Sequence, residues 1–161
     1  MQPEVTTRTA TSADADKAVA VLRASISQLC HADHNGDAAA LTDWLANKTP
    51  QRFVAWLARR DRHTIVAERD GTLCGVGMLG TDGGVYICYV RPGYERRGVG
   101  RALMNALEAQ AKTWRLERLH LDSTRTAQQF YEAMGFSRSG EPNPRFGVTG
   151  MPYEKRLLPS D

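Results

Sequence analysis

A glycine turn followed by several arginines is the part of the sequence best suited to chemistry. Residues 90–104 read VRPGYERRGVGRALM, and the apolar segment Val85–Val90 leads into them. The apolar segment before the turn predicts a strand, and apolar residues at helical spacing after Gly98 predict a helix. The first amides of a helix have no intrahelical acceptor and lie at the positive end of the helix dipole. The turn is therefore a candidate anion site.

The residue types in the turn favour a diphosphate as the anion. Gly98 and Gly100 lack Cβ atoms and allow close approach to the backbone, while Arg96, Arg97 and Arg101 offer charge-assisted hydrogen bonds. The alternative is a solvated basic turn with a glycine cap. The spacing matches neither the P-loop nor the dinucleotide-binding fingerprint, so those two phosphate sites are excluded.

Length and composition predict a single domain spanning residues 1–161. Hydrophobic residues make up 42% and charged residues 24%, and neither a membrane-spanning run nor a secretory signal is evident. The cysteines (Cys30, Cys74 and Cys88) form no Cys-x-x-Cys pair, which is typical of reduced thiols in a cytoplasmic protein. A net charge of +3 without a long basic stripe suits a small anionic ligand. We expect neither nucleic acid nor a membrane as partner.

The order of elements predicts a mixed α+β fold. Helical patterns come early, three strands then form a meander, and the glycine turn opens a long helix that ends near Trp114. A strand, a helix, a loop and a last strand follow. The predicted ranges are strands 5–9, 63–68, 73–79, 85–90, 118–122 and 151–158, helices 12–29, 98–114 and 126–134, helix starts at 41 and 50, and a loop over 137–150.

Two motifs in these positions resemble those of the GNAT superfamily of acyl-CoA-dependent N-acyltransferases. Residues 95–100, Glu-Arg-Arg-Gly-Val-Gly, are similar to its motif A, with Glu95 in place of Gln or Arg. Residues 130–136, Phe-Tyr-Glu-Ala-Met-Gly-Phe, are similar to its motif B. The resemblance implies a GNAT-like fold, in which a mixed central β-sheet has a splayed, V-shaped opening and helices flank both faces.

The resemblance also implies acetyl-CoA as co-substrate, without a metal. The main chain of Cys88, Tyr89 and Val90 would bind the pantetheine arm, and Thr124 would either contact the cofactor or cap a helix. The pyrophosphate would be held at Arg96, Arg97, Gly98, Val99, Gly100 and Arg101.

Acetyl transfer by direct attack of a primary amine needs an oxyanion donor, an acid and a base. Amides near Tyr89 or Val90, where the strand is expected to bulge, are candidate donors. The resemblance implies Tyr131 as the acid that protonates or stabilises the departing thiolate. Asp122 is the candidate base, with His120 or water as alternatives. Many relatives carry a carboxylate where this chain has Tyr86.

Other functions remain open at this point. The departures from the family pattern allow a CoA-binding regulatory module without turnover, and the arginines allow a phosphate or nucleic-acid binder. The acceptor would be a small-molecule or peptide amine, and the frequency of dimers among relatives implies a homodimer. The segment Cys30–His34 holds residue types that bind metals, but we interpret it as a polar loop that borders the acceptor pocket.

Overall fold

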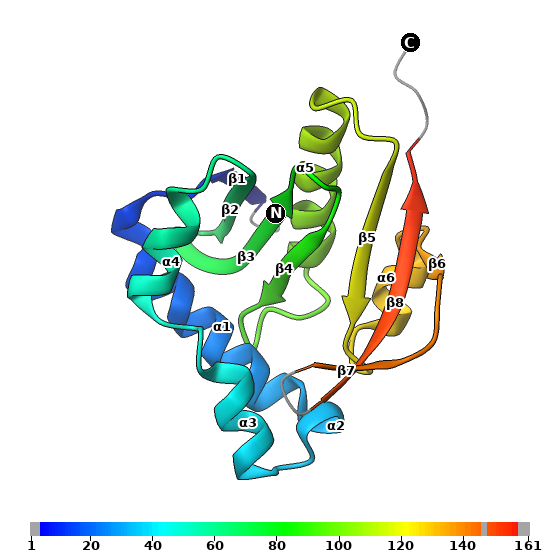
Figure 1. Ribbon diagram of the computed structural model, residues 1–161. Coiled ribbons are helices and arrows are strands. Elements are labelled where there is room, and N and C mark those ends of the chain that lie inside the picture. Colours follow the sequence, from blue (N-terminus) through cyan, green and yellow to red (C-terminus); the bar gives the residue numbers. More distant parts are fainter. Residues whose placement is uncertain (1–3, 146–147, 158–161) are drawn as a thin grey trace.

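Two groups of strands and the helices that cover them make up the computed structural model, which describes residues 4–145 and 148–157 (Figure 1). The elements are β1 (Val5–Thr9), the 3-10 turn η1 (Ser12–Asp14), α1 (Ala15–Leu29), α2 (His31–His34), α3 (Ala38–Leu45), α4 (Pro50–Leu57), β2 (Arg62–Arg69), β3 (Thr72–Gly80), β4 (Val85–Val90), α5 (Val99–Thr113), β5 (Arg118–Ser123), α6 (Gln128–Ala133), β6 (Ser137–Arg138), β7 (Asn143–Arg145) and β8 (Val148–Arg156).

Strands β1 to β4 form an antiparallel sheet in chain order. Almost all of β3 is buried, because helices cover both faces of this sheet. Helices α1 and α4 pack with Val76 and Ile87 on one face, and α5 packs with Ile65 and Ala67 on the other. The predicted mixed fold with helices on both faces is confirmed.

Two glycines of β3 let α5 lie close to the sheet. A Cβ on Gly75 would lie 2.8 Å from Val99 Cγ1, and one on Gly77 would lie 3.3 Å from Leu107 Cδ1. Both of these α5 side chains are buried at the interface. The absence of side chains at the two glycines therefore fixes where α5, and the anion loop before it, stands relative to β4.

Strands β4 and β5 touch at one end and separate along their length. Among the described residues their ladder consists of a single parallel bridge between Gly84 and His120, and Figure 1 shows the strands diverging below it. Gly83, with φ of 88°, is needed at this joint, since a Cβ there would lie 2.6 Å from the Arg118 carbonyl oxygen. The predicted V-shaped opening is confirmed. The central sheet consists of two antiparallel groups joined by this bridge.

The C-terminal part differs from the sequence prediction. The stretch 137–150, predicted as a loop, contains β6, β7 and the start of β8. These strands pair with β8 itself, as in Ser137↔Glu154 and Asn143↔Gly150. The pairing overrides a local composition rich in proline and glycine. Leu158, the predicted end of the last strand, lies outside the described residues.

Helix α6 is also shorter than the predicted 126–134. The Thr124 hydroxyl accepts a hydrogen bond from the Ala127 amide at 3.1 Å, and this turn delays the helix start. Gly135 ends the helix with φ of 95°, as its position predicts. The part of the chain that the structure describes contains no helix long and apolar enough to cross a bilayer.

Candidate active site

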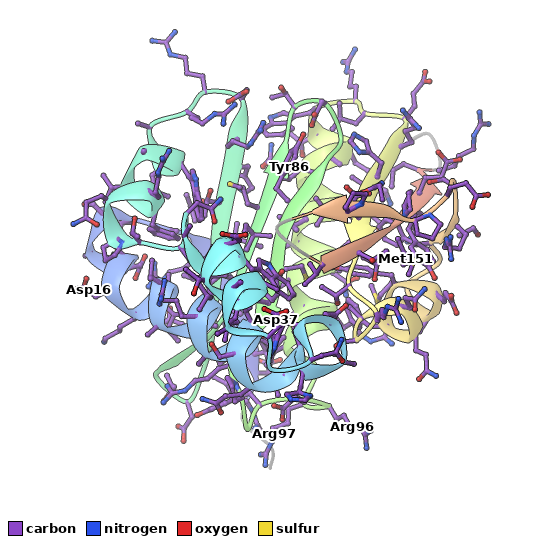
Figure 2. All side chains as sticks on the ribbon, turned by 60° about the horizontal axis from the view of Figure 1, so that its bottom comes forward. Asp16, Asp37, Tyr86, Arg96, Arg97 and Met151 are labelled. Atoms are coloured by element: carbon purple, nitrogen blue, oxygen red, sulfur yellow. The ribbon has the colours of Figure 1, made fainter. Side chains whose placement is uncertain are left out.

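The loop between β4 and α5 bends through left-handed conformations at Arg96 (φ 60°) and Gly98 (φ 84°). Such conformations turn successive amides toward one side, which favours binding of an anion. The Ala102 amide makes the first helical hydrogen bond, to the Gly98 carbonyl at 3.0 Å. The amides of residues 99–101 therefore donate to no helical carbonyl. Figure 2 shows Arg96 and Arg97 projecting from this loop, at the opposite end of the view from Tyr86.

The two motif A glycines have different surroundings. A Cβ on Gly98 would meet no atom within 4 Å, so the space beside this residue is open to a ligand. A Cβ on Gly100 would lie 3.0 Å from Phe130 Cε1. The room expected beside Gly100 for an anion is thus filled by an aromatic ring of α6. Gly100 is needed for the packing of the two motifs against each other.

Glu95, the residue that departs from the family pattern, bonds to its own loop. Its carboxylate accepts a hydrogen bond from the Gly93 amide at 2.9 Å. The bond stabilises the turn and occupies one carboxylate oxygen. The negative charge still lies within the anion loop and weakens its attraction for phosphate.

The free edge of β4 faces the opening. The Arg91 amide bonds to the Cys74 carbonyl of β3 at 2.8 Å. Because main-chain groups alternate along a strand, Tyr89 also turns its amide and carbonyl toward β3, whereas Cys88 and Val90 turn theirs toward β5. The predicted main-chain contact therefore suits Cys88 and Val90 but not Tyr89, whose side chain lines the cleft described below.

The bulge of β4 lies elsewhere than predicted. The ladder with β3 is regular from Gly75↔Val90 to Met78↔Ile87 and then shifts to Leu79↔Val85. Tyr86 is therefore the extra residue, and the expected bulge at Tyr89 or Val90 is wrong. The Tyr86 hydroxyl donates to the Asp82 carboxylate. This contact lies in the β3–β4 turn and not at the wide end of the opening.

Tyr131 and Cys88 meet between α6 and β4. Tyr131 belongs to the buried hydrophobic cluster against which Cys88 packs. Burial is the main cause that raises the pKa of the Tyr131 phenol well above its ordinary value. Burial likewise raises the pKa of the Cys88 thiol to about 12, although the contact with Tyr131 opposes the shift. Both groups hold their protons at neutral pH, so the phenol is a hydrogen-bond donor.

A cleft of about 420 Å³ occupies the opening on the side of His120. The side chains that define it are Trp44, Lys48, Tyr86, Tyr89, His120, Asp122 and Tyr153. Tyr89 lines the cleft, whereas Tyr131 is not among its lining residues. Trp44, Lys48 and Tyr153 were missed by the sequence analysis because they belong to no motif, and only the folding of α3 and β8 brings them here.

Asp122 and Thr124 lie where β5 leads into α6. Asp122 is exposed and lines the cleft. Thr124 also borders the cleft, and its hydroxyl caps the turn before α6. Of the two roles expected for Thr124, the structure shows the cap.

The residues of metal-binding type near Cys30 have other partners. The Asp33 carboxylate accepts from the Arg125 amide at 2.6 Å and from the Thr126 hydroxyl at 2.7 Å. His34 is buried, and its Nδ1 accepts from the Gly36 amide at 3.0 Å. The segment forms α2 and fastens it to the β5–α6 turn, as a structural element beside the cleft.

Comparisons with known proteins agree with this geometry. The family model described as "Acetyltransferase (GNAT) domain" matches residues 30–157. No curated protein matches the sequence. A GCN5-related N-acetyltransferase of Rhodopseudomonas palustris shares 26% identity at a TM-score of 0.83, with 98% of this chain and 97% of that chain covered.

Two further solved structures share the fold at lower identity. The PaiA N-acetyltransferase of Thermoplasma acidophilum, solved with coenzyme A, has 18% identity and a TM-score of 0.83, with 96% of this chain and 99% of that chain covered. YncA of Salmonella typhimurium, solved with its cofactor acetyl-CoA, has 20% identity and a TM-score of 0.69, with 96% and 94% covered. Since the family model covers most of the sequence, the chain belongs to the GNAT acetyltransferase family.

Proposed function

We propose that the protein transfers an acetyl group from acetyl-CoA to a primary amine, in a ternary complex. The observation that carries this proposal is the opening between β4 and β5, which has an anion loop at one end and a separate cleft along its side. Two substrates can thus reach one reaction centre from different directions. Acetyl-CoA supplies the thioester, and the chain supplies the groups that hold and activate both substrates.

The residues present fit the diphosphate and the pantetheine arm. The open space beside Gly98 and the amides of residues 99–101 suit the diphosphate, with Arg96, Arg97 and Arg101 exposed around them. The main-chain groups of Cys88 and Val90 face the opening and suit the amides of a pantetheine arm. The Val90 and Cys88 amides are also the candidate oxyanion donors.

Tyr131 is the proposed acid. Its raised pKa keeps the phenol protonated, and Cys88 packs against the cluster that contains it. A protonated hydroxyl is suited to stabilise the thiolate that leaves during transfer. The buried setting strengthens this interaction, because little water competes for the developing charge.

The amine is proposed to enter through the cleft of about 420 Å³. The Asp122 carboxylate on β5 faces this space, which suits attraction of an ammonium group or, as the sequence predicts, removal of its proton. Aromatic walls from Tyr86 and Tyr153 add apolar contact area. A small-molecule amine or the exposed amine of a peptide is the proposed acceptor.

Release of free thiol from acetyl-CoA tests the proposal. The protein is assayed with n-butylamine, spermidine and a peptide with a free N-terminus, and Tyr131→Phe is compared with the parent. We expect kcat to fall by about 10²-fold, with the KM for acetyl-CoA unchanged. Thr113→Ala, which removes a hydroxyl near the end of α5, is the matched control.

A CoA-binding module without turnover is the second candidate, favoured by Tyr86 at the position where relatives carry a carboxylate. Thermal unfolding separates the two candidates, since a ligand that binds only the folded state raises its stability. A thermal shift with CoA, together with no thiol release from any of the three amines, would identify the module and overturn the enzyme.

A further inference from the structure

The turn at the closed end of the opening holds the His120 ring in one orientation. His120 Nε2 lies 3.1 Å from the Asp82 carbonyl oxygen, and the His120 amide donates to the Gly83 carbonyl at 3.0 Å. A carbonyl oxygen only accepts hydrogen bonds, so Nε2 must carry the hydrogen. A neutral imidazole protonated at Nε2 has its lone pair on Nδ1. The structure thus gives His120 a defined tautomer with a basic nitrogen at Nδ1.

Asp82 makes this orientation rigid. Its carboxylate accepts from the Gly84 amide at 2.9 Å and from the Tyr86 hydroxyl, so both side chain and carbonyl of Asp82 are bonded in the turn. The Arg62 guanidinium lies over the Tyr86 ring, 4.1 Å from its centre. Burial alone would raise the pKa of Asp82, but the hydrogen bonds from Tyr86 and Gly84 and the nearby positive charges lower it. Asp82 therefore remains a carboxylate.

Charged side chains surround His120 at this end of the cleft. His120 and Asp122 are two residues apart on β5 and line the same cleft, and Asp82 lies beside His120 in the turn. Arg118 of β5 and Glu154 of the neighbouring strand β8 form an ion pair of 2.9 Å, and their charges largely cancel each other. Lys48 and Tyr86 also line the cleft, and the Arg62 guanidinium lies over the Tyr86 ring. Two carboxylates thus flank the ring.

We propose that His120 Nδ1 removes the proton from the attacking amine, an inference that rests on the proposed acetyl transfer. The amine nitrogen forms a bond to the thioester carbonyl carbon, the carbon–sulfur bond breaks, and the sulfur leaves with the electron pair. The proton lost by the nitrogen goes to Nδ1, and the departing thiolate accepts a hydrogen bond from the Tyr131 phenol. His120 then releases its proton to water, and water protonates the thiolate, so both residues are in their starting state.

The arrangement favours His120 over Asp122 as the base. Imidazole is by nature a stronger base than a carboxylate and is better matched to an amine at neutral pH. The His120 ring and main chain are both hydrogen-bonded to the β3–β4 turn, which fixes the orientation of the basic nitrogen. Asp122 is then the group that attracts the amine, and Asp82 is a positioning residue that acts through His120.

His120→Gln separates the basic nitrogen from the structural bond. The glutamine amide keeps an N–H donor for the Asp82 carbonyl but has no basic nitrogen. We expect kcat for the amine that the parent acetylates fastest, among n-butylamine, spermidine and a peptide N-terminus, to fall by about 10²-fold. The KM for acetyl-CoA should not change, and added imidazole should restore part of the rate. The parent should lose activity toward acid pH, and the variant should not show this loss.

Two controls separate the proposed role of His120 from that of Asp122 and from the proposed function itself. Asp122→Asn should raise the KM for the amine and keep the acid limb of the pH profile. Nitrogen-15 spectra of labelled histidine, assigned by comparison with His120→Gln, should show the Nε2–H tautomer. Parental rates in His120→Gln, or an Nδ1–H tautomer, would overturn this inference and leave the proposed function intact. A parent that releases no thiol with any amine would overturn both.

Discussion

Replacing Gly75 with alanine tests whether the close packing of α5 on the sheet sets the geometry of the anion loop. The added Cβ would lie 2.8 Å from Val99 Cγ1 and 3.0 Å from Leu103 Cδ1, well inside the carbon–carbon optimum of about 3.5–4.0 Å. Val99 is the first residue of α5, and its amide is part of the proposed anion site. Relief of the contact therefore moves the first helical turn, which is the part that we propose binds diphosphate.

Two opposing effects determine how much Gly75→Ala changes the free energy of unfolding. Overpacking a well-filled core by one methyl group costs about 1–3 kcal/mol. Alanine in place of glycine returns about 0.5–1 kcal/mol by restricting the unfolded chain. We therefore expect the free energy of unfolding to fall by about 1–2 kcal/mol, which lowers Tm by about 3–6 °C for a chain of this length.

Urea unfolding followed by circular dichroism measures the stability, and calorimetric titration measures the affinity for CoA. Gly77→Ala is the matched control, because its Cβ would lie 3.3 Å from Leu107, farther along α5. It should cost less stability and leave CoA affinity within about twofold, whereas Gly75→Ala should weaken CoA binding by about 5-fold or more. Equal stabilities of the parent and the Gly75 variant, or a larger loss in the Gly77 variant, would refute this reasoning.

Two further perturbations test charge. Glu95→Gln keeps an oxygen that accepts a hydrogen bond from the Gly93 amide but removes a negative charge from the anion loop. CoA should therefore bind about 2- to 5-fold more tightly at low salt, measured by calorimetry, and the gain should shrink as the salt concentration rises. Unchanged affinity at low salt would contradict this prediction. Hydrogen bonds from Arg8 lower the pKa of Asp14 in the folded state to about 2, against the effect of burial. In the unfolded chain the pKa of an aspartate is about 3.9, so Asp14 becomes protonated there first as the pH falls. Stability present above about pH 4 should be lost toward pH 2, and urea midpoints of Asp14→Asn should show a smaller acid slope than those of the parent.

Local signals predicted the part of the fold that builds the anion site. The strand Val85–Val90 was predicted with its observed bounds, because an apolar run there is closed on both sides by glycine turns. The start of α5 was predicted within one residue for a related reason, since Gly98 has the left-handed conformation that its place before a helix requires. Local structure that depends on one short segment could thus be predicted from that segment.

Structural features that depend on contacts between distant segments could not be predicted from local sequence patterns. The pairing of β6 and β7 with β8 is decided by the partner strand, and the bulge at Tyr86 depends on how the β3–β4 turn meets β5. The same holds within the site. Gly100 was interpreted through its missing side chain alone, although its neighbour Phe130 lies thirty positions later. The tautomer of His120 is set by the carbonyl of Asp82, which no sequence pattern near either residue reveals.

The narrow joint at the bridge between Gly84 and His120 also affects how the protein behaves in concentrated solution. A strand with unsatisfied amides at the rim of a sheet normally recruits a strand from another molecule, and aggregation follows. Here two such rims, those of β4 and β5, face each other across an internal wedge. The fold can therefore leave main-chain amides along the edge of β4 available to a ligand while the facing strand β5 keeps strands of neighbouring molecules away from them.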